Sequence, residues 1–221
     1  MILEEVFPNP RNRSLEAEDL NTLYPKVEGI RFNYVLSANT KTSSNSDEAS
    51  NQIDRELLKF IRSQSDLIIT TGKTARSENL KASQFAPMLI LTRSSDELNV
   101  PAVEPNDAKP VYVSQRLGTI YQSDKAIAIG GIQDSLPEFV ESFSRANNQK
   151  HLVLESGVET ARVFSLSGAL QEVDLTVTKA VSQAEAEVVA KEFLNLIQFS
   201  DAILIQVLRS EGTWFFRYGA A

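Results

Sequence analysis

The sequence of 221 residues contains no cysteine and a single histidine, His151. The absence of cysteine excludes disulfides, iron–sulfur clusters, a cysteine nucleophile and zinc sites built on thiolates. With one histidine, a histidine-rich metal site is excluded as well, and we expect no metal ion. A Ser–His–Asp triad could use only His151, which no serine and aspartate pattern accompanies. We therefore interpret His151 as a surface or hydrogen-bonded side chain.

Basic residues are also scarce, with 22 Lys and Arg against 29 Asp and Glu and a net charge of −7. Nucleic acids and anionic membranes are bound by clustered Lys and Arg, so we expect neither as a partner. No apolar run approaches the roughly 20 residues that span a bilayer. The first residues are acidic and include Pro8, unlike the basic and apolar regions of a signal peptide. These features predict a cytoplasmic protein.

Short apolar runs of strand length alternate with stretches of helical periodicity along most of the chain. We expect residues 1–29, which prolines and Gly29 interrupt, to form an arm with one short helix, and residues 30–221 to form one domain. Strands are expected at residues 31–37, 66–71, 88–92, 111–113, 126–129, 151–155 and 172–179. Helices are expected at residues 51–65, from residue 74, and at 136–146, 157–168 and 183–199. The alternation predicts a three-layer α/β fold with a mixed, mostly parallel central sheet. Residues 202–208 and 213–218 flank Glu211-Gly212 and predict a closing antiparallel hairpin.

The first candidate site is the turn after the strand at residues 66–71. The strand meets Gly72, and Thr71, Thr74 and Arg76 lie beside it before Glu78. Backbone N–H groups and threonine hydroxyls at such a turn can hold a phosphate. The turn is not a P-loop, because leucine stands at position 67 in place of the first glycine. An ordinary capped helix is the alternative interpretation.

The second candidate site follows the strand at residues 151–155. Glu155 ends that strand, where a carboxylate could accept hydrogen bonds from a ring N–H or a sugar hydroxyl. Gly157 permits close approach of the backbone to a ligand. The alternative is a capping box, in which Ser156 caps the helix and Glu159 completes it.

Two further polar residues stand out. Asn33 lies within an apolar strand, and because a buried amide must be hydrogen-bonded, it contacts either backbone or a ligand. Arg62 lies late in the helix at residues 51–65, with leucine rather than an acid four residues before it. Two interpretations of Arg62 stay open: a solvated surface side chain, or a side chain that contacts an anion.

Taken together, these segments resemble the reductase domain of riboflavin biosynthesis, the bacterial deaminase–reductase C-terminal family, which has a dihydrofolate-reductase-like fold. Residues 72–78 (GKTARSE) are similar to its Gly-x-x-Thr-x-Arg-x-Glu/Asp turn, and residues 154–157 (LESG) resemble its Glu-Gly-Gly turn. Residues 168–172 (GALQE) resemble its Gly-Leu-Val-Asp-Glu stretch, and residues 213–218 its closing Arg-Tyr strand. The resemblance covers roughly residues 23–218 in the family's order.

The resemblance implies an NADPH-dependent reductase that opens the ribose of a ribosylamino-pyrimidine phosphate to a ribityl chain, with hydride chemistry supplied by the cofactor. It implies catalytic positions at Asn33, Asn39 and Glu155, and substrate contacts from Arg62 and Glu155. The cofactor-binding residues that it implies are Thr71, Gly72, Thr74, Arg76, Glu78, Ser156, Gly157, Val158, Glu159 and Thr160. Lys73 and Arg76 are candidates for a 2′-phosphate, which would favour NADPH over NADH.

The family's Ser-x-Asp-Gly stretch reads Ser37-Ala38-Asn39-Thr40 here, and Ser156 replaces the first glycine of the Glu-Gly-Gly turn. Asn39 can hydrogen-bond but cannot act as an acid or base at neutral pH. Losing a required proton-handling group costs on the order of 10²–10⁴ in rate. Two alternatives therefore stay open: a reductase of the same fold with another small substrate, and a non-catalytic nucleotide-binding member.

A homodimer is also expected, because members of the family pair through their sheets. Trp214, Phe215 and Phe216 are adjacent in an expected strand and present rings to both of its faces. At least one ring would then need cover beyond the monomer core, unless the helix at residues 183–199 supplies it.

Overall fold

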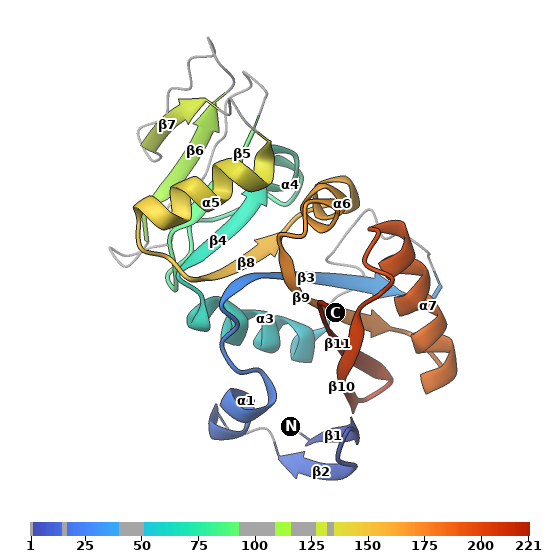
Figure 1. Cartoon of the computed structure of the whole chain (residues 1–221). Helices are drawn as coiled ribbons and strands as arrows, with labels where there is room; N and C mark the ends of the chain where they lie inside the picture. Colours follow the sequence, from blue (N-terminus) through green and yellow to red (C-terminus); the bar gives the residue numbers. More distant parts are fainter. Residues whose placement is uncertain (1, 15–16, 40–50, 93–108, 116–126, 132–134) are drawn as a thin grey trace.

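The structure, a computed structural model, describes residues 2–14, 17–39, 51–92, 109–115, 127–131 and 135–221. Figure 1 shows its helices and strands. The helices are α1 (Ala17–Leu23), α3 (Gln52–Gln64), α4 (Gly72–Ser77), α5 (Leu136–Ala146), α6 (Val158–Leu166) and α7 (Gln183–Leu196). The strands are β1 (Ile2–Phe7), β2 (Arg11–Ser14), β3 (Gly29–Ser37), β4 (Leu67–Thr71), β5 (Met88–Leu91), β6 (Val111–Gln115), β7 (Ile127–Gly131), β8 (His151–Glu155), β9 (Leu170–Thr178), β10 (Ile203–Ser210) and β11 (Thr213–Gly219).

The described strands form one mixed sheet in the order β2-β1-β10-β11-β9-β3-β8-β4-β5-β6-β7. The strands from β9 to β7 in that order run parallel to their neighbours. The pairs that involve β11, β10, β1 and β2 are antiparallel. The predicted α/β fold, with a mixed, mostly parallel central sheet and a closing antiparallel hairpin, is confirmed.

The closing hairpin turns at Glu211 and Gly212, which both have positive φ, at 47° and 75°. Two central residues with positive φ match the right-handed twist of the flanking strands, and glycine adopts such a φ without steric cost. The Glu-Gly pair therefore fixes the register in which Ser210 faces Thr213 and Val207 faces Phe216.

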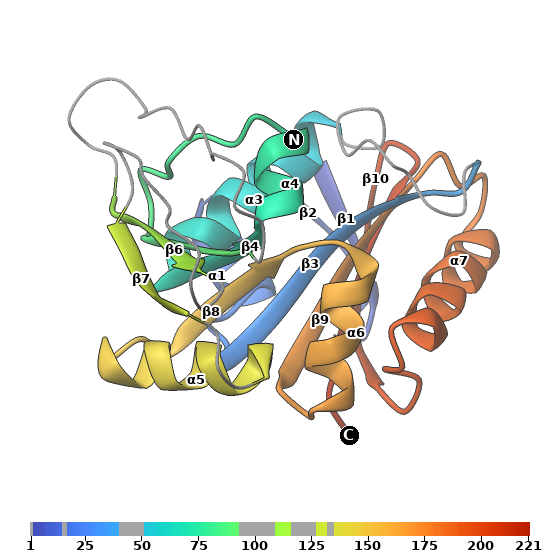
Figure 2. The same ribbon diagram turned by 90° about the horizontal axis from the view of Figure 1, so that it is seen from above.

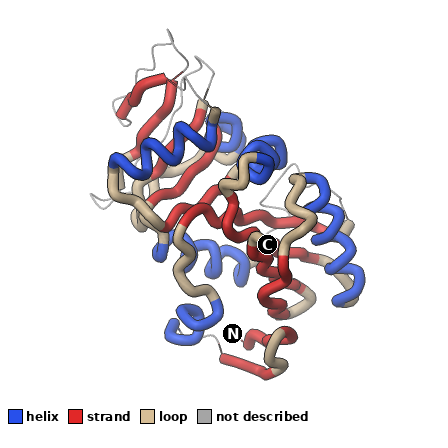
Figure 3. The backbone as a smooth tube through the Cα atoms, viewed as in Figure 1, coloured by secondary structure: helices blue, strands red, loops and turns tan. Residues whose placement is uncertain are grey.

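The N-terminal segment differs from the predicted arm. β1 pairs with β10, and β2 pairs with β1, so both strands extend the sheet at one end. Figure 3 shows them beside α1, below the rest of the sheet. The short run before Pro8 and Pro10 was not predicted as a strand, because the prolines interrupt it. Its strand conformation depends on pairing with β10, which lies far away in the sequence.

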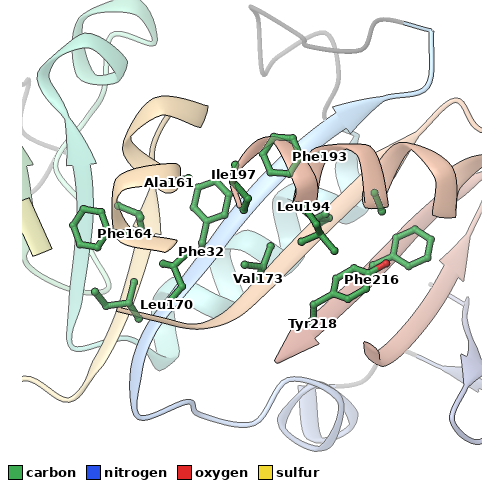
Figure 4. Packing of buried hydrophobic residues seen from close by; sticks show 14 of the residues in the cluster. Phe32, Ala161, Phe164, Leu170, Val173, Phe193, Leu194, Ile197, Phe216 and Tyr218 are labelled. Carbon is green, nitrogen blue, oxygen red and sulfur yellow. The ribbon is translucent and has the colours of Figure 1, made fainter. Parts of the chain in front are cut away.

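Each face of the sheet carries its own apolar core. Phe32, Phe164 and Phe193 belong to the core on the face that α5, α6 and α7 cover (Figures 2 and 4). Ile53, Leu57 and Ile61 of α3 pack on the opposite face, together with residues of α1 and α4. This arrangement explains why the central strands are apolar on both sides.

The three adjacent aromatic residues of β11 alternate between these cores. Trp214 and Phe216 face the core under α7, and Phe215 faces the core under α3. All three are buried within the single chain, with exposed fractions of 6%, 2% and 0% for Trp214, Phe215 and Phe216. The prediction that one ring needs cover beyond the monomer was therefore wrong, because α7 and α3 cover both faces. Within the described residues, no helix is long and apolar enough to cross a membrane.

Candidate functional site

The two predicted turns leave neighbouring strands at the same edge of the sheet. β4 and β8 pair in parallel, and Thr70 lies opposite Glu155 in their register. Because the carboxyl ends of parallel strands meet at one edge, the turn that starts at Thr71 and the turn that starts at Ser156 are neighbours. This is the place where open α/β sheets bind ligands.

The turn after β4 is held by threonine hydroxyls. Thr71 is the N-cap of α4, and its Oγ1 accepts a hydrogen bond from the Thr74 backbone N–H at 3.2 Å. The two hydroxyls of Thr71 and Thr74 lie 3.0 Å apart. A Cβ placed on Gly72 would meet Thr92 at 2.7 Å, so packing alone requires this glycine. Arg76 and Glu78, two of the predicted cofactor-binding residues, are exposed at this turn.

The turn after β8 is open. Gly157 is the N-cap of α6 with φ −71° and makes no side-chain capping bond, and a Cβ placed on it would meet nothing within 4 Å. The alternative capping box was wrong, because the buried Ser156 directs its Oγ to the Gly157 carbonyl at 3.4 Å. The first N–H groups of a helix lack intrahelical acceptors. Those at Val158 and Glu159 are therefore available to an anion.

Arg62 and Glu155 bind each other. The Arg62 Nε donates to Oε1 of Glu155 at 2.8 Å, and Nη2 donates to Oε2 at 2.5 Å. The two side chains are 25% and 14% exposed. Burial opposes the charged guanidinium, but the Glu155 and Glu78 carboxylates outweigh burial and raise the pKa of Arg62. Sequence reasoning selected both residues, and the structure shows that they form one bidentate ion pair.

Tyr34 and Thr70 also belong to this edge. Tyr34 was not predicted as a site residue, and Thr70 was predicted only as the first residue of the turn after β4. Burial, with the charge of Glu78, raises the pKa of the Tyr34 hydroxyl, and its ring stacks on Phe193 at 4.7 Å between centroids. The Thr70 Oγ1 is buried without a hydrogen-bond partner. A buried hydroxyl without a partner is unusual in a folded protein.

A polar row crosses the sheet beneath α3. Asn33 lies opposite Asp174 in the pairing of β3 with β9, and Thr70 lies opposite Glu155 in the pairing of β4 with β8. Phe32 pairs with Leu154, which puts Asn33 at the level of Glu155. Asn33 is half-buried, and the strand register places it at the same edge as Glu155. Asn39 is exposed beyond the end of β3, and Thr40 lies outside the described residues.

A buried charge cluster lies next to this row and was not predicted. Arg31 and Arg217 each contact Glu172 at 2.8 Å, and their distances to Asp174 are longer, 3.3 and 3.8 Å. Each of the four side chains is at most 6% exposed. Arg31 also donates to the Pro25 carbonyl at 2.7 Å, which ties the segment before β3 to the sheet.

The pKa values of Glu172 and Asp174 are shifted in opposite directions. Burial alone would raise the pKa of Glu172, but hydrogen bonds and charge from Arg217 and Arg31 outweigh burial and lower it. Burial raises the pKa of Asp174 to about 8. The charge of Glu172 raises it further, whereas the charges of Arg31 and Arg217 oppose the shift. Neither oxygen of Asp174 has a hydrogen-bond partner of good geometry. Burial therefore favours the protonated form of the Asp174 carboxyl group.

Comparison with known proteins identifies the fold. No protein-family model matches the chain, and neither does any curated protein sequence. A pyrimidine reductase-like protein from Corynebacterium diphtheriae is 14% identical, with 91% of this chain and 98% of that chain covered and a TM-score of 0.67. The deaminase/reductase of Thermotoga maritima is 12% identical with a TM-score of 0.65, and the match covers 93% of this chain and 60% of that one.

The riboflavin biosynthesis reductase Rib7 of Saccharomyces cerevisiae is similar as well. It is 11% identical, with 88% of this chain and 90% of that chain covered and a TM-score of 0.60. At these identities the likeness establishes the fold alone, and the three similar proteins are described as reductases or as reductase-like. The chain spans about 60% of the length of the bifunctional Thermotoga protein.

Proposed function

We propose that the protein is a nicotinamide-dependent reductase of the pyrimidine-reductase type. The observation that carries the proposal is the open N-terminus of α6 at Gly157, beside the Arg62–Glu155 pair at one edge of the sheet. The reductases that share the fold support the proposal. A small heterocycle of the phosphorylated pyrimidine class is the proposed substrate.

The residues present fit a dinucleotide. The uncapped N–H groups of α6 and the space above Gly157 suit a pyrophosphate, because a helix N-terminus attracts anions. The Thr71 and Thr74 hydroxyls with Arg76 and Lys73 would hold the adenosine end, and a 2′-phosphate there would favour NADPH. The cofactor, when bound, supplies the hydride. Glu155, held by Arg62, would orient the substrate against it.

A second candidate function is non-catalytic nucleotide binding. It is favoured by Asn39, which replaces the family's aspartate and cannot transfer a proton at neutral pH. Catalysis would then have to use a carboxyl group elsewhere, and Glu155 is engaged by Arg62.

Titration with NADPH, followed by a turnover assay with the ribosylamino-pyrimidine phosphate, separates these functions. Binding with turnover supports the reductase, and binding without turnover of any pyrimidine supports the second candidate. Failure to bind NADPH or NADH contradicts both. The homodimer and the cytoplasmic location stay predictions, and light scattering that gives a species near 24.5 kDa would contradict the dimer.

A further inference from the structure

The Arg62 guanidinium already has a carboxylate in the position that a phosphate would take. Its Nε and Nη2 donate to the two oxygens of Glu155 at 2.8 and 2.5 Å. This fork of two parallel donors is the arrangement by which arginine recognises phosphate as well as carboxylate. Glu155 therefore occupies the edge of the guanidinium that an anionic ligand would need, and neutralises its charge.

The charges around this pair repel an anion further. Among the described residues, the charged groups that act on Arg62 are Glu155 and Glu78, which are both acidic. Glu78 also acts on the Tyr34 hydroxyl. The charges of Glu155 and Glu78 both oppose the approach of an anion to Arg62.

The same edge offers hydrogen-bond acceptors. An ionised carboxylate has about four lone-pair sites, of which Arg62 uses two on Glu155. A ligand rich in N–H groups would complement the remaining Glu155 lone pairs.

We infer that the Arg62–Glu155 pair selects a neutral or cationic group that donates hydrogen bonds and rejects phosphate, and that Arg62 is a positioning residue that acts through Glu155. The inference rests on the proposed function, since it specifies the part of the proposed substrate that meets Glu155. A phosphate on that substrate is bound elsewhere on the protein or is absent from the substrate.

The first experiment uses inorganic phosphate as an anion probe, with calorimetric titration of the full chain. The wild type should not bind phosphate at Arg62. Glu155→Gln keeps the shape of the side chain but frees the guanidinium, so phosphate affinity should rise by about tenfold or more. Glu56→Gln, on the same helix as Arg62 and exposed, is the matched control and should behave as the wild type. Phosphate binding by the wild type that Arg62→Gln abolishes would overturn the inference.

Two variants keep the experiment decisive if Glu155→Gln does not fold. Glu78→Gln, at an exposed position, should weaken the rejection of phosphate in the same direction but less. Arg62→Gln should lower the affinity for diaminouracil, a neutral pyrimidine rich in N–H groups, and Arg62→Lys should restore part of it. Equal diaminouracil affinity in the wild type, Arg62→Gln and Glu155→Gln would overturn the inference.

NADPH binding, measured on the same samples, separates the two claims. If NADPH fails to bind while the phosphate and diaminouracil results are as expected, the proposed reductase falls and the selectivity of this edge stands. If NADPH binds and the wild type holds phosphate through Arg62, the selectivity falls and the reductase stands.

Discussion

Replacing Asp174 by asparagine should remove a large part of the pH dependence of stability between pH 4 and pH 8. The Asp174 carboxyl is buried, and its pKa rises from the ordinary 3.8 to about 8. A group whose folded-state pKa is raised contributes stability that is complete below its unfolded pKa. That contribution is lost as the pH rises through the folded pKa. Between these values the folded protein holds a proton that the unfolded chain has released.

The magnitude follows from this one proton. A difference of one bound proton changes the free energy of unfolding by about 1.4 kcal/mol for each pH unit. Raising the pH from 5 to 7 should therefore cost the wild type about 3 kcal/mol through Asp174. The asparagine side chain of the variant would not ionise, so the variant should lack this slope. The difference in stability between the variant and the wild type should widen in favour of the variant as the pH rises.

Urea unfolding followed by tryptophan fluorescence at several pH values measures this difference, because Trp214 is buried in the core. Asp201→Asn is the matched control, since Asp201 is exposed and the profile of that variant should run parallel to the wild type. Parallel profiles for Asp174→Asn and the wild type between pH 5 and pH 7 would refute the reasoning. Asp174 would then be ionised in the folded protein and stabilised by Arg31 and Arg217.

Other substitutions separate packing from ligand binding. Gly157→Val should abolish NADPH binding with little change in melting temperature, because its φ is negative and the space above it is open; unchanged NADPH affinity would remove α6 from the cofactor site. Gly72→Ala should destabilise the fold by roughly 1–3 kcal/mol through contact with Thr92, as thermal unfolding would show. Glu172→Gln should cost roughly 3–5 kcal/mol, because it leaves two buried arginines with one carboxyl group. It should also lower the pKa of Asp174, which urea unfolding across pH would detect. Gly212→Val should cost about 1–2 kcal/mol, because positive φ strains a residue with a Cβ; a loss near zero in thermal unfolding would contradict the turn geometry.

The fold could be predicted where local pattern decides it. Ile53, Leu57 and Ile61 recur at helical spacing and pack as that spacing implies, and the Glu211-Gly212 pair predicted the closing turn correctly. β1 was not predicted, because its strand conformation depends on a partner that is distant in the sequence. A short strand at the end of a sheet is stabilised by its partner, and β10 lies at the far end of the sequence.

The candidate site could be predicted only as separate residues. Arg62 and Glu155 each stood out, but they are 93 positions apart, and nothing in the sequence shows that one neutralises the other. The buried cluster gave no signal, because Arg31 in a strand alternates with apolar residues as a surface side chain would. Its burial depends on β9 and β11 carrying Glu172, Asp174 and Arg217 to the same face.

The place of β3 in the sheet also determines when the protein can fold on the ribosome. β3 is synthesised early, yet it lies between β8 and β9, and Arg31 and Glu172 are 141 positions apart. At translation rates of roughly 5–20 residues per second, β3 waits on the order of ten seconds for either neighbour. During that time its apolar side chains are available to chaperones. The nascent chain should therefore become resistant to protease only after β9 has left the ribosome tunnel.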